Sequence, residues 1–258
     1  MSKLVLGNWK MHPGIRESLA LARGVLLGIR GKEALPEIVL FPPFLALPEV
    51  HKLLARSRVG LGAQDLFWEE VGAFTGEVSS RILLEVGCRH VLVGHSERRE
   101  HLGETDAMVR RKVEAAWRAK LVPVVCVGES ATERESGGAE AAVEARLRAV
   151  LGGLAFPPSA RLVVAYEPLW AVGSGTPALP EQAAERHALI RTLLVRDFGF
   201  PVAAVRVAYG GSVMGENAYA FLREPEVDGV LVGGASLKLA QFLEIIQAAS
   251  DVLGSRNP

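Results

Sequence analysis

Cysteine is scarce in this sequence, which has only Cys88 and Cys126 among 258 residues. Both lie in or beside apolar segments, and two cysteines in a chain of this length without secretory context are expected to stay reduced. The sequence therefore predicts two buried thiols and no disulfide. No group of cysteine or histidine residues has the spacing of metal ligands, so we expect no metal site.

Net charge and long apolar runs are also missing. The 29 basic residues balance 29 acidic ones, so the chain lacks the overall charge of a protein that binds nucleic acid or a membrane surface. No apolar run is long enough to span a bilayer, and the N-terminus has no signal-peptide pattern. These absences predict a cytoplasmic protein without nucleic-acid or membrane partners, in which any anion site is local.

Eight apolar, β-branched runs recur along the chain: LVLG, EIVLF, VGLGA, HVLVG, LVPVVCVG, LVVAYE, AVRVAYG and DGVLVGG. Amphipathic segments separate most of them, and we expect helices over 14–29, 105–119, 139–151, 180–195 and 237–252. Strands that alternate with helices indicate a parallel sheet with right-handed crossovers. Eight such units in about 250 residues is the usual size of a (β/α)₈ TIM barrel.

An open doubly wound sheet is the competing α/β fold. Its first turn would often carry G-x-G-x-x-G, whereas the first strand here leads into GNWKMHPG. Pro123 inside the fifth run is a mild objection to a central strand, but it lies near the start of that run. No linker divides the chain, so we expect a single barrel domain over 1–258.

Glu167 is the most informative residue. It ends the sixth run, and Pro168 stops the strand directly after it. The apolar segment 169–172 then leads into a glycine-containing stretch, 173–175, a composition that suits a water-excluding flap. A carboxylate at a strand end under such a flap suggests a general base.

Two other strand ends carry polar residues. Asn8 and Lys10 follow the first run and would project to one side if the extended conformation persists. His95 follows the fourth run, before Ser96, which we expect to cap a short helix. The helix dipole would favour a neutral imidazole at that position. Taken alone, Lys10 could be a solvated cation and His95 a structural residue.

Glycine-rich turns end the seventh and eighth runs, as YGGS at 209–212 and VGGAS at 232–236. Glycines let backbone N–H groups approach an anion closely, so these turns together with Gly173 predict a phosphate site. The combined set suits proton abstraction next to a carbonyl on a small phosphorylated compound. Glu167 would be the base, His95 the electrophile and Lys10 the cation at the developing oxyanion, with no cofactor required.

The chain also resembles the triosephosphate isomerase family over nearly its whole length. GNWKM, GAFTGE, GHSERRE, CVGE, YEPLWAVGSG, YGGSV and LVGGASL occur in that family's order and approximate spacing. That family is a standard example of a glutamate base, a neutral histidine electrophile and a closing loop, so the roles below are the family's. The resemblance implies that dihydroxyacetone phosphate and glyceraldehyde 3-phosphate are interconverted through an enediol.

The resemblance assigns roles to individual residues. Glu167 would shuttle the proton, His95 would polarise the carbonyl, Asn8 and Lys10 would contact the substrate, and Glu97 would orient Lys10. The backbone at Gly173, Ser212, Gly233 and Gly234 would hold the phosphate. The segment after the third strand looks like an arm that reaches into a second subunit, where Thr75 supports Asn8 and Lys10. The expected assembly is a homodimer, with a tetramer also open.

The second half of the flap departs from the family's pattern. Thr176 and Pro177 stand where the family usually has lysine and a small residue, and Leu179 replaces a capping threonine. His12 and Met214 each stand where asparagine is common. We expect these changes to affect loop kinetics and not the chemistry. Two alternatives remain: an aldolase or lyase that uses Lys10 as a Schiff base, and a non-catalytic phosphate-binding barrel.

Overall fold

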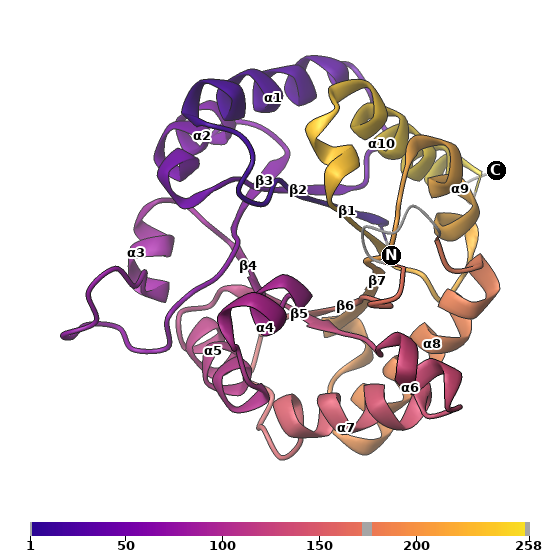
Figure 1. Ribbon diagram of the computed structural model, residues 1–258. Helices are drawn as coiled ribbons and strands as arrows, with labels where there is room; N and C mark the ends of the chain where they lie inside the picture. Colours follow the sequence, from indigo (N-terminus) through magenta and orange to yellow (C-terminus); the bar gives the residue numbers. More distant parts are fainter. Residues whose placement is uncertain (1, 172–176, 256–258) are drawn as a thin grey trace.

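Eight parallel strands form a closed barrel in chain order, in which each strand pairs with the next and β8 pairs with β1 (Figure 1). The computed structural model describes residues 2–171 and 177–255. The strands are β1 (Leu4–Asn8), β2 (Glu37–Phe41), β3 (Val59–Ala63), β4 (His90–Val93), β5 (Val122–Val127), β6 (Leu162–Tyr166), β7 (Val205–Tyr209) and β8 (Gly229–Val232). All eight expected strands are present, which confirms the TIM barrel over the doubly wound sheet.

Helices surround the barrel (Figure 1). They are α1 (Ile15–Gly28), α2 (Leu47–Leu54), α3 (Ser80–Glu85), α4 (Ser96–Leu102), α5 (Asp106–Arg118), α6 (Ala131–Glu135), α7 (Ala139–Leu151), α8 (Pro180–Thr192), α9 (Gly215–Arg223) and α10 (Leu239–Gly254). The five helices expected from periodicity are α1, α5, α7, α8 and α10. Short 3₁₀ turns lie at 44–46, 202–204 and 234–237, and a π turn at 193–197 extends α8.

The strands are buried on both faces, which explains why they read as continuous apolar runs. Along β1, Leu4 and Leu6 belong to one buried cluster and Val5 to another. Because strand side chains alternate, the smaller cluster fills the barrel and the larger one packs between barrel and helices. Pro123 sits in β5 opposite Val91 without interrupting the barrel.

The two cysteines are free and buried, as the sequence predicts. Burial raises the pKa of Cys88 to about 12, so this thiol stays protonated. Among the helices of the described residues, none is long and apolar enough to cross a membrane.

One segment leaves the ring of helices. Residues 64–79, between β3 and α3, extend outward from the barrel (Figure 1), and a bridge between Phe67 and Ser79 holds their base together. Val71 is 73% exposed and Phe74 is 44% exposed on this arm. Met11, in the turn after β1, is 94% exposed. Such apolar exposure at a projecting segment is typical of a protein–protein contact.

Candidate active site

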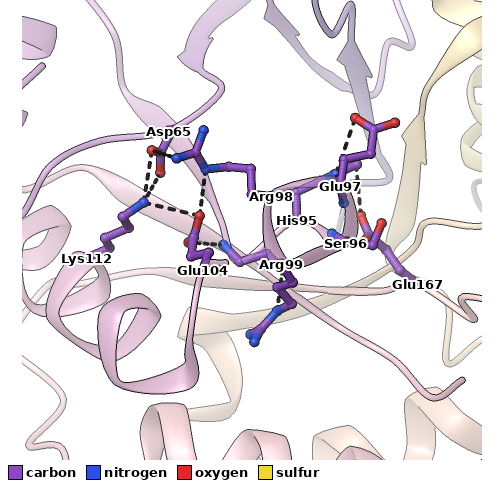
Figure 2. A network of polar contacts seen from close by, with 10 residues as sticks. Asp65, His95, Ser96, Glu97, Arg98, Arg99, Glu104, Lys112 and Glu167 are labelled. Atoms are coloured by element: carbon purple, nitrogen blue, oxygen red, sulfur yellow. Dashed lines mark hydrogen bonds and ion pairs between the residues drawn. The ribbon is translucent and has the colours of Figure 1, made fainter. Parts of the chain in front are cut away.

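Glu167 directly follows β6 and is 2% exposed. Its backbone N–H donates to the carbonyl of Val127 at 2.7 Å, which extends the strand pairing to this residue. One carboxylate oxygen, Oε2, accepts the backbone N–H of Ser96 at 3.2 Å. The other, Oε1, lies 3.4 Å from Nε2 of His95 (Figure 2). Strand β6 therefore places the carboxylate against the start of α4.

His95 caps α4 with its own side chain. Its Nδ1 accepts the backbone N–H of Glu97 at 3.3 Å, so this nitrogen carries no proton and the neutral ring bears its proton on Nε2. The prediction that Ser96 caps the helix is wrong, because Ser96 is the first helical residue. Within the described part of the chain its buried hydroxyl has no hydrogen-bond partner. The expected neutral imidazole follows from this geometry.

Lys10 and Asn8 lie together, but not in the way the sequence suggested. The expected extended conformation ends before Lys10, which has a left-handed φ of 51°. Its backbone N–H donates to Oδ1 of Asn8 at 3.0 Å, and its carbonyl accepts from Nε2 of Gln64 at 2.8 Å. Gln64 was not singled out from the sequence, since only this contact reveals that it fixes the turn. The turn directs both side chains into one cavity.

The ammonium of Lys10 pairs with Oε1 of Glu97 at 2.5 Å. Burial raises the pKa of Glu97, but the hydrogen bond and positive charge of Lys10 lower it by more, so its net pKa is below the ordinary value. Glu97 is therefore ionised at neutral pH. The pair joins the turn after β1 to helix α4.

The glycine-rich turns line the same cavity as Asn8, Lys10, His95 and Glu167. This cavity has a volume of about 240 Å³, and its other walls include Gly210–Met214, Leu231, Gly233–Ala235, Lys238 and Gln241. A Cβ atom on Gly233 would lie 3.3 Å from Cε of Lys10, so the lysine passes close to this turn. Gly173 lies outside the described residues. Ser212, Gly233 and Gly234 are thus brought together with the polar groups.

Glycine is also required around Glu167 itself. A Cβ atom on Gly128 would lie 1.7 Å from the backbone oxygen of Glu167, and one on Gly210 would lie 2.9 Å from its Cγ. Neither substitution fits without moving the carboxylate. Cys126 lies on the neighbouring strand β5. Burial and then the charge of Glu167 raise the pKa of its thiol well above the ordinary value.

A buried ionic cluster behind α4 was missed from the sequence (Figure 2). Lys112, 2% exposed, contacts Asp65 at 2.7 Å and Glu104 at 3.2 Å. Arg98 of α4 contacts the same two carboxylates at 2.8 and 2.6 Å. The second oxygen of Glu104 accepts the N–H of Gly94, next to His95, at 3.1 Å. The four charged residues come from four separate segments of the chain, so no short sequence motif identifies the cluster.

Glu129 was also not singled out, although CVGE was part of the resemblance. Its Oε1 accepts from the hydroxyl of Tyr166 and from Nε1 of Trp170, both at 2.9 Å. The guanidinium of Arg134 lies 3.6 Å from the centre of the Trp170 ring. Trp170 is thus held at the start of the flap by a carboxylate and a cation.

The helix after the flap has lost its usual cap, as predicted. Leu179 precedes α8, its side chain offers no capping hydrogen bond, and it is 60% exposed. The side chain of Gln182 accepts the N–H of Leu179 at 3.3 Å, which is partial compensation. Thr176 falls outside the described residues.

Thr75 lies exposed on the 64–79 arm, and no hydrogen bond joins it to Asn8 or Lys10 within the described chain. Across residues 2–171 and 177–255, no group of three or more His, Cys, Asp or Glu side chains could hold a metal ion.

The closed barrel and its strand-end residues define an aldose–ketose isomerase of the TIM-barrel class. The sequence profile named "Triosephosphate isomerase" matches residues 3–249. The chain therefore belongs to the triosephosphate isomerase family, and its activity is the isomerisation of a triose phosphate.

Relatives and a solved structure agree with this assignment. The chain is 49% identical to the triosephosphate isomerase of Chloroflexus aurantiacus over 94% of its own length and 97% of the relative's. It is 47% identical to that of Rhodopirellula baltica over 95% and 97%. It also superimposes on the crystal structure of the Bartonella henselae enzyme with a TM-score of 0.84 and 36% identity, covering 96% and 99% of the two chains.

Proposed function

We propose that Glu167 is the base that moves a proton between the carbonyl carbon and the adjacent hydroxyl-bearing carbon, interconverting dihydroxyacetone phosphate and D-glyceraldehyde 3-phosphate through an enediol. The observation that carries this proposal is the position of Glu167 within 3.4 Å of a protonated Nε2 of His95, in the cavity that also holds Lys10. A base, a hydrogen-bond donor and a cation thus converge on one small volume.

His95 acts as the electrophile. Its Nε2–H donates to the substrate oxygen, while the N–H of Glu97 holds Nδ1. Lys10 stabilises the negative charge that develops on this oxygen, Asn8 fixes the turn that carries Lys10, and Glu97 orients the ammonium. The carboxylate of Glu167 leaves the N–H of Ser96 when it takes the proton.

The phosphate is held by backbone N–H groups of Ser212, Gly233 and Gly234, with Gly173 of the flap as a further contact. Three considerations support this: the three described residues line the catalytic cavity, glycines leave the backbone accessible, and the fold often binds phosphate after its seventh and eighth strands. The reaction then needs no cofactor.

The test is turnover of glyceraldehyde 3-phosphate in a coupled assay. Glu167→Gln removes the base and is expected to lower kcat by about 10²- to 10⁴-fold. Glu167→Asp withdraws the carboxylate by one methylene and is expected to lower kcat while phosphate binding persists. Glu185→Gln is the control, since Glu185 is exposed on α8 without a described ion pair. Near-normal turnover of Glu167→Gln would contradict the assignment of Glu167 as the base.

The Schiff-base alternative has its own measurement. Lys10 is already paired with Glu97 at 2.5 Å, so its nitrogen would have to leave this carboxylate before it could attack a carbonyl and form a Schiff base. Borohydride added with substrate is therefore expected to leave the protein's mass unchanged. A trapped adduct at Lys10 would support the lyase.

The assembly is proposed to be a homodimer in which the 64–79 arm reaches the partner's site and Thr75 supports Asn8 and Lys10 there. The exposed Met11, Val71 and Phe74 support this contact. Light scattering measures the mass directly and separates a dimer from a tetramer. Phe74→Asp is expected to give monomers with reduced turnover. The proposed location is the cytoplasm.

A further inference from the structure

The charges at the catalytic end of the cavity do not favour an anionic substrate. A phosphate monoester carries nearly two negative charges at neutral pH. The charge of Lys10 is already matched by Glu97 at 2.5 Å. Glu167 adds a further carboxylate to the same cavity, and its described ion-pair contact is with His95 at 3.4 Å. These side chains together therefore carry no excess of positive charge that would attract the substrate.

Lys238 supplies a positive charge at the other end. It lies between the 3₁₀ turn Gly234–Leu237 and α10, and it lines the cavity together with Gly233 and Gly234. Across residues 2–171 and 177–255 no carboxylate lies within ion-pair distance of its ammonium. Gln241, which also lines the cavity one turn later on α10, is uncharged.

The backbone of Lys238 is fixed although its side chain is exposed. Its N–H donates to the carbonyl of Ala235 at 3.2 Å, and its carbonyl accepts the N–H of Phe242 at 3.0 Å. The buried Phe242 ties this point to the core. The cation therefore extends into solvent from a rigid base beside the phosphate turns.

We propose that Lys238 attracts the phosphate group of the substrate and guides that end of the molecule into the cavity, leaving the chemical step to the residues named above. This inference rests on the proposed function of the cavity and adds a positioning residue to it. An unpaired charge at a cavity mouth raises the association rate through its field, and dissolved salt screens that field.

The experiment compares Lys238→Gln and Lys238→Glu with the wild-type chain. Lys120→Gln is the matched control, since it removes the same charge from an exposed lysine two residues before β5, at the opposite end of the barrel. The readouts are kcat and kcat/KM for glyceraldehyde 3-phosphate at several salt concentrations, and binding of inorganic phosphate by calorimetry.

At about 0.01 M salt, Lys238→Gln is expected to lower kcat/KM by about 3- to 10-fold and to weaken phosphate binding by a similar factor, with kcat changed less than about 2-fold. Lys238→Glu reverses the charge instead of removing it, so its fold-loss is expected to be roughly the square of the loss for Lys238→Gln. At about 1 M salt the losses are expected to disappear.

Three results would overturn the proposal: an unchanged kcat/KM, an equal loss in Lys120→Gln, or a loss that salt does not diminish. Failure of the proposed function looks different. If Glu167 is not the base, Glu167→Gln keeps its turnover. Lys238→Gln would still weaken the binding of inorganic phosphate that calorimetry measures.

Discussion

The Nδ1 atom of His95 accepts the backbone N–H of Glu97 at 3.3 Å. One contact therefore caps helix α4 and selects the tautomer whose proton points from Nε2 into the cavity. The same helix presents Glu97 to Lys10, so its first turn positions the electrophile and the partner of the cation together.

This contact predicts a neutral Nε2–H imidazole at neutral pH. ¹⁵N spectra of the labelled protein are expected to show an unprotonated Nδ1 and a protonated Nε2 for His95, assigned by comparison with His95→Gln. The glutamine lacks the ring acceptor for the Glu97 N–H, and kcat is expected to fall by about 10²-fold or more. Two protonated nitrogens in the wild-type spectrum would contradict this reading.

A second prediction concerns Pro177, at the departure from the family's flap. The next residue, Ala178, donates its N–H to the hydroxyl of Tyr209 at 3.0 Å. Proline fixes its own φ and limits the conformations of the residue before it, so it narrows the backbone freedom next to the hydrogen bond of Ala178. Pro177→Ala is therefore expected to change turnover by less than about tenfold without abolishing it. Pro158→Ala, in an exposed loop elsewhere, is the control. Identical turnover and loop relaxation in Pro177→Ala would leave the proline no kinetic role.

Stability offers a third prediction at Lys120, whose φ is 58°. It follows α5 in a turn where the N–H of Leu121 donates to the carbonyl of Ala116 at 2.8 Å. Glycine adopts this conformation without strain, so Lys120→Gly is expected to raise the free energy of unfolding by about 0.5–1 kcal/mol. Gly103→Ala, at φ 67° with no atom near the new Cβ, is expected to lower it by a similar amount. Urea titration measures both variants, and a destabilised Lys120→Gly would refute the argument.

A fourth prediction concerns acid stability and Glu37. The hydrogen bond from His90 lowers the pKa of Glu37 despite the opposing effect of burial, and Arg206 and Arg161 lower it further, to about 2 from 4.5. Because the folded-state pKa is depressed, this stabilisation is present above pH 4.5 and is lost as the pH falls toward 2.

Glu37→Gln removes this titration. The expected loss at pH 7 is about 1–2 kcal/mol, reduced from the full linkage value because the carboxylate is partly exposed to solvent. Between pH 4.5 and 2 the variant's unfolding free energy should vary less with pH than that of the wild type or of the Glu185→Gln control. Parallel pH profiles for all three chains would show that Glu37 contributes nothing to acid unfolding.

The barrel could be predicted from sequence because burial on both faces leaves a plain pattern of apolar runs. Glu167 and His95 could be located because each follows such a run directly. The conformation of Lys10 could not, since its left-handed φ accompanies a hydrogen bond from its N–H to the side chain of Asn8 and another to its carbonyl from Gln64, which follows a different strand. Ser96 failed as a cap because preference scales favour serine and do not show that the helix begins one residue earlier, where the imidazole of His95 accepts the N–H of Glu97.

Ionic partners were the least predictable part of the site. Lys112 meets Asp65 and Glu104 only after α5 has packed against the barrel. Lys238 carries no sequence signal either, because a lysine after a glycine-rich turn is ordinary until its place in the cavity is known.

The pairing of β1 with β8 also governs when the chain can finish folding. Leu4 pairs in register with Gly229, and Gly7 with Val232. During synthesis from the N-terminus, β1 therefore waits with one edge unpaired until nearly the whole chain has been made. Chains that stop before residue 229 would leave that edge open to other strands, so premature termination near the end is expected to yield aggregates and not a slightly weakened barrel.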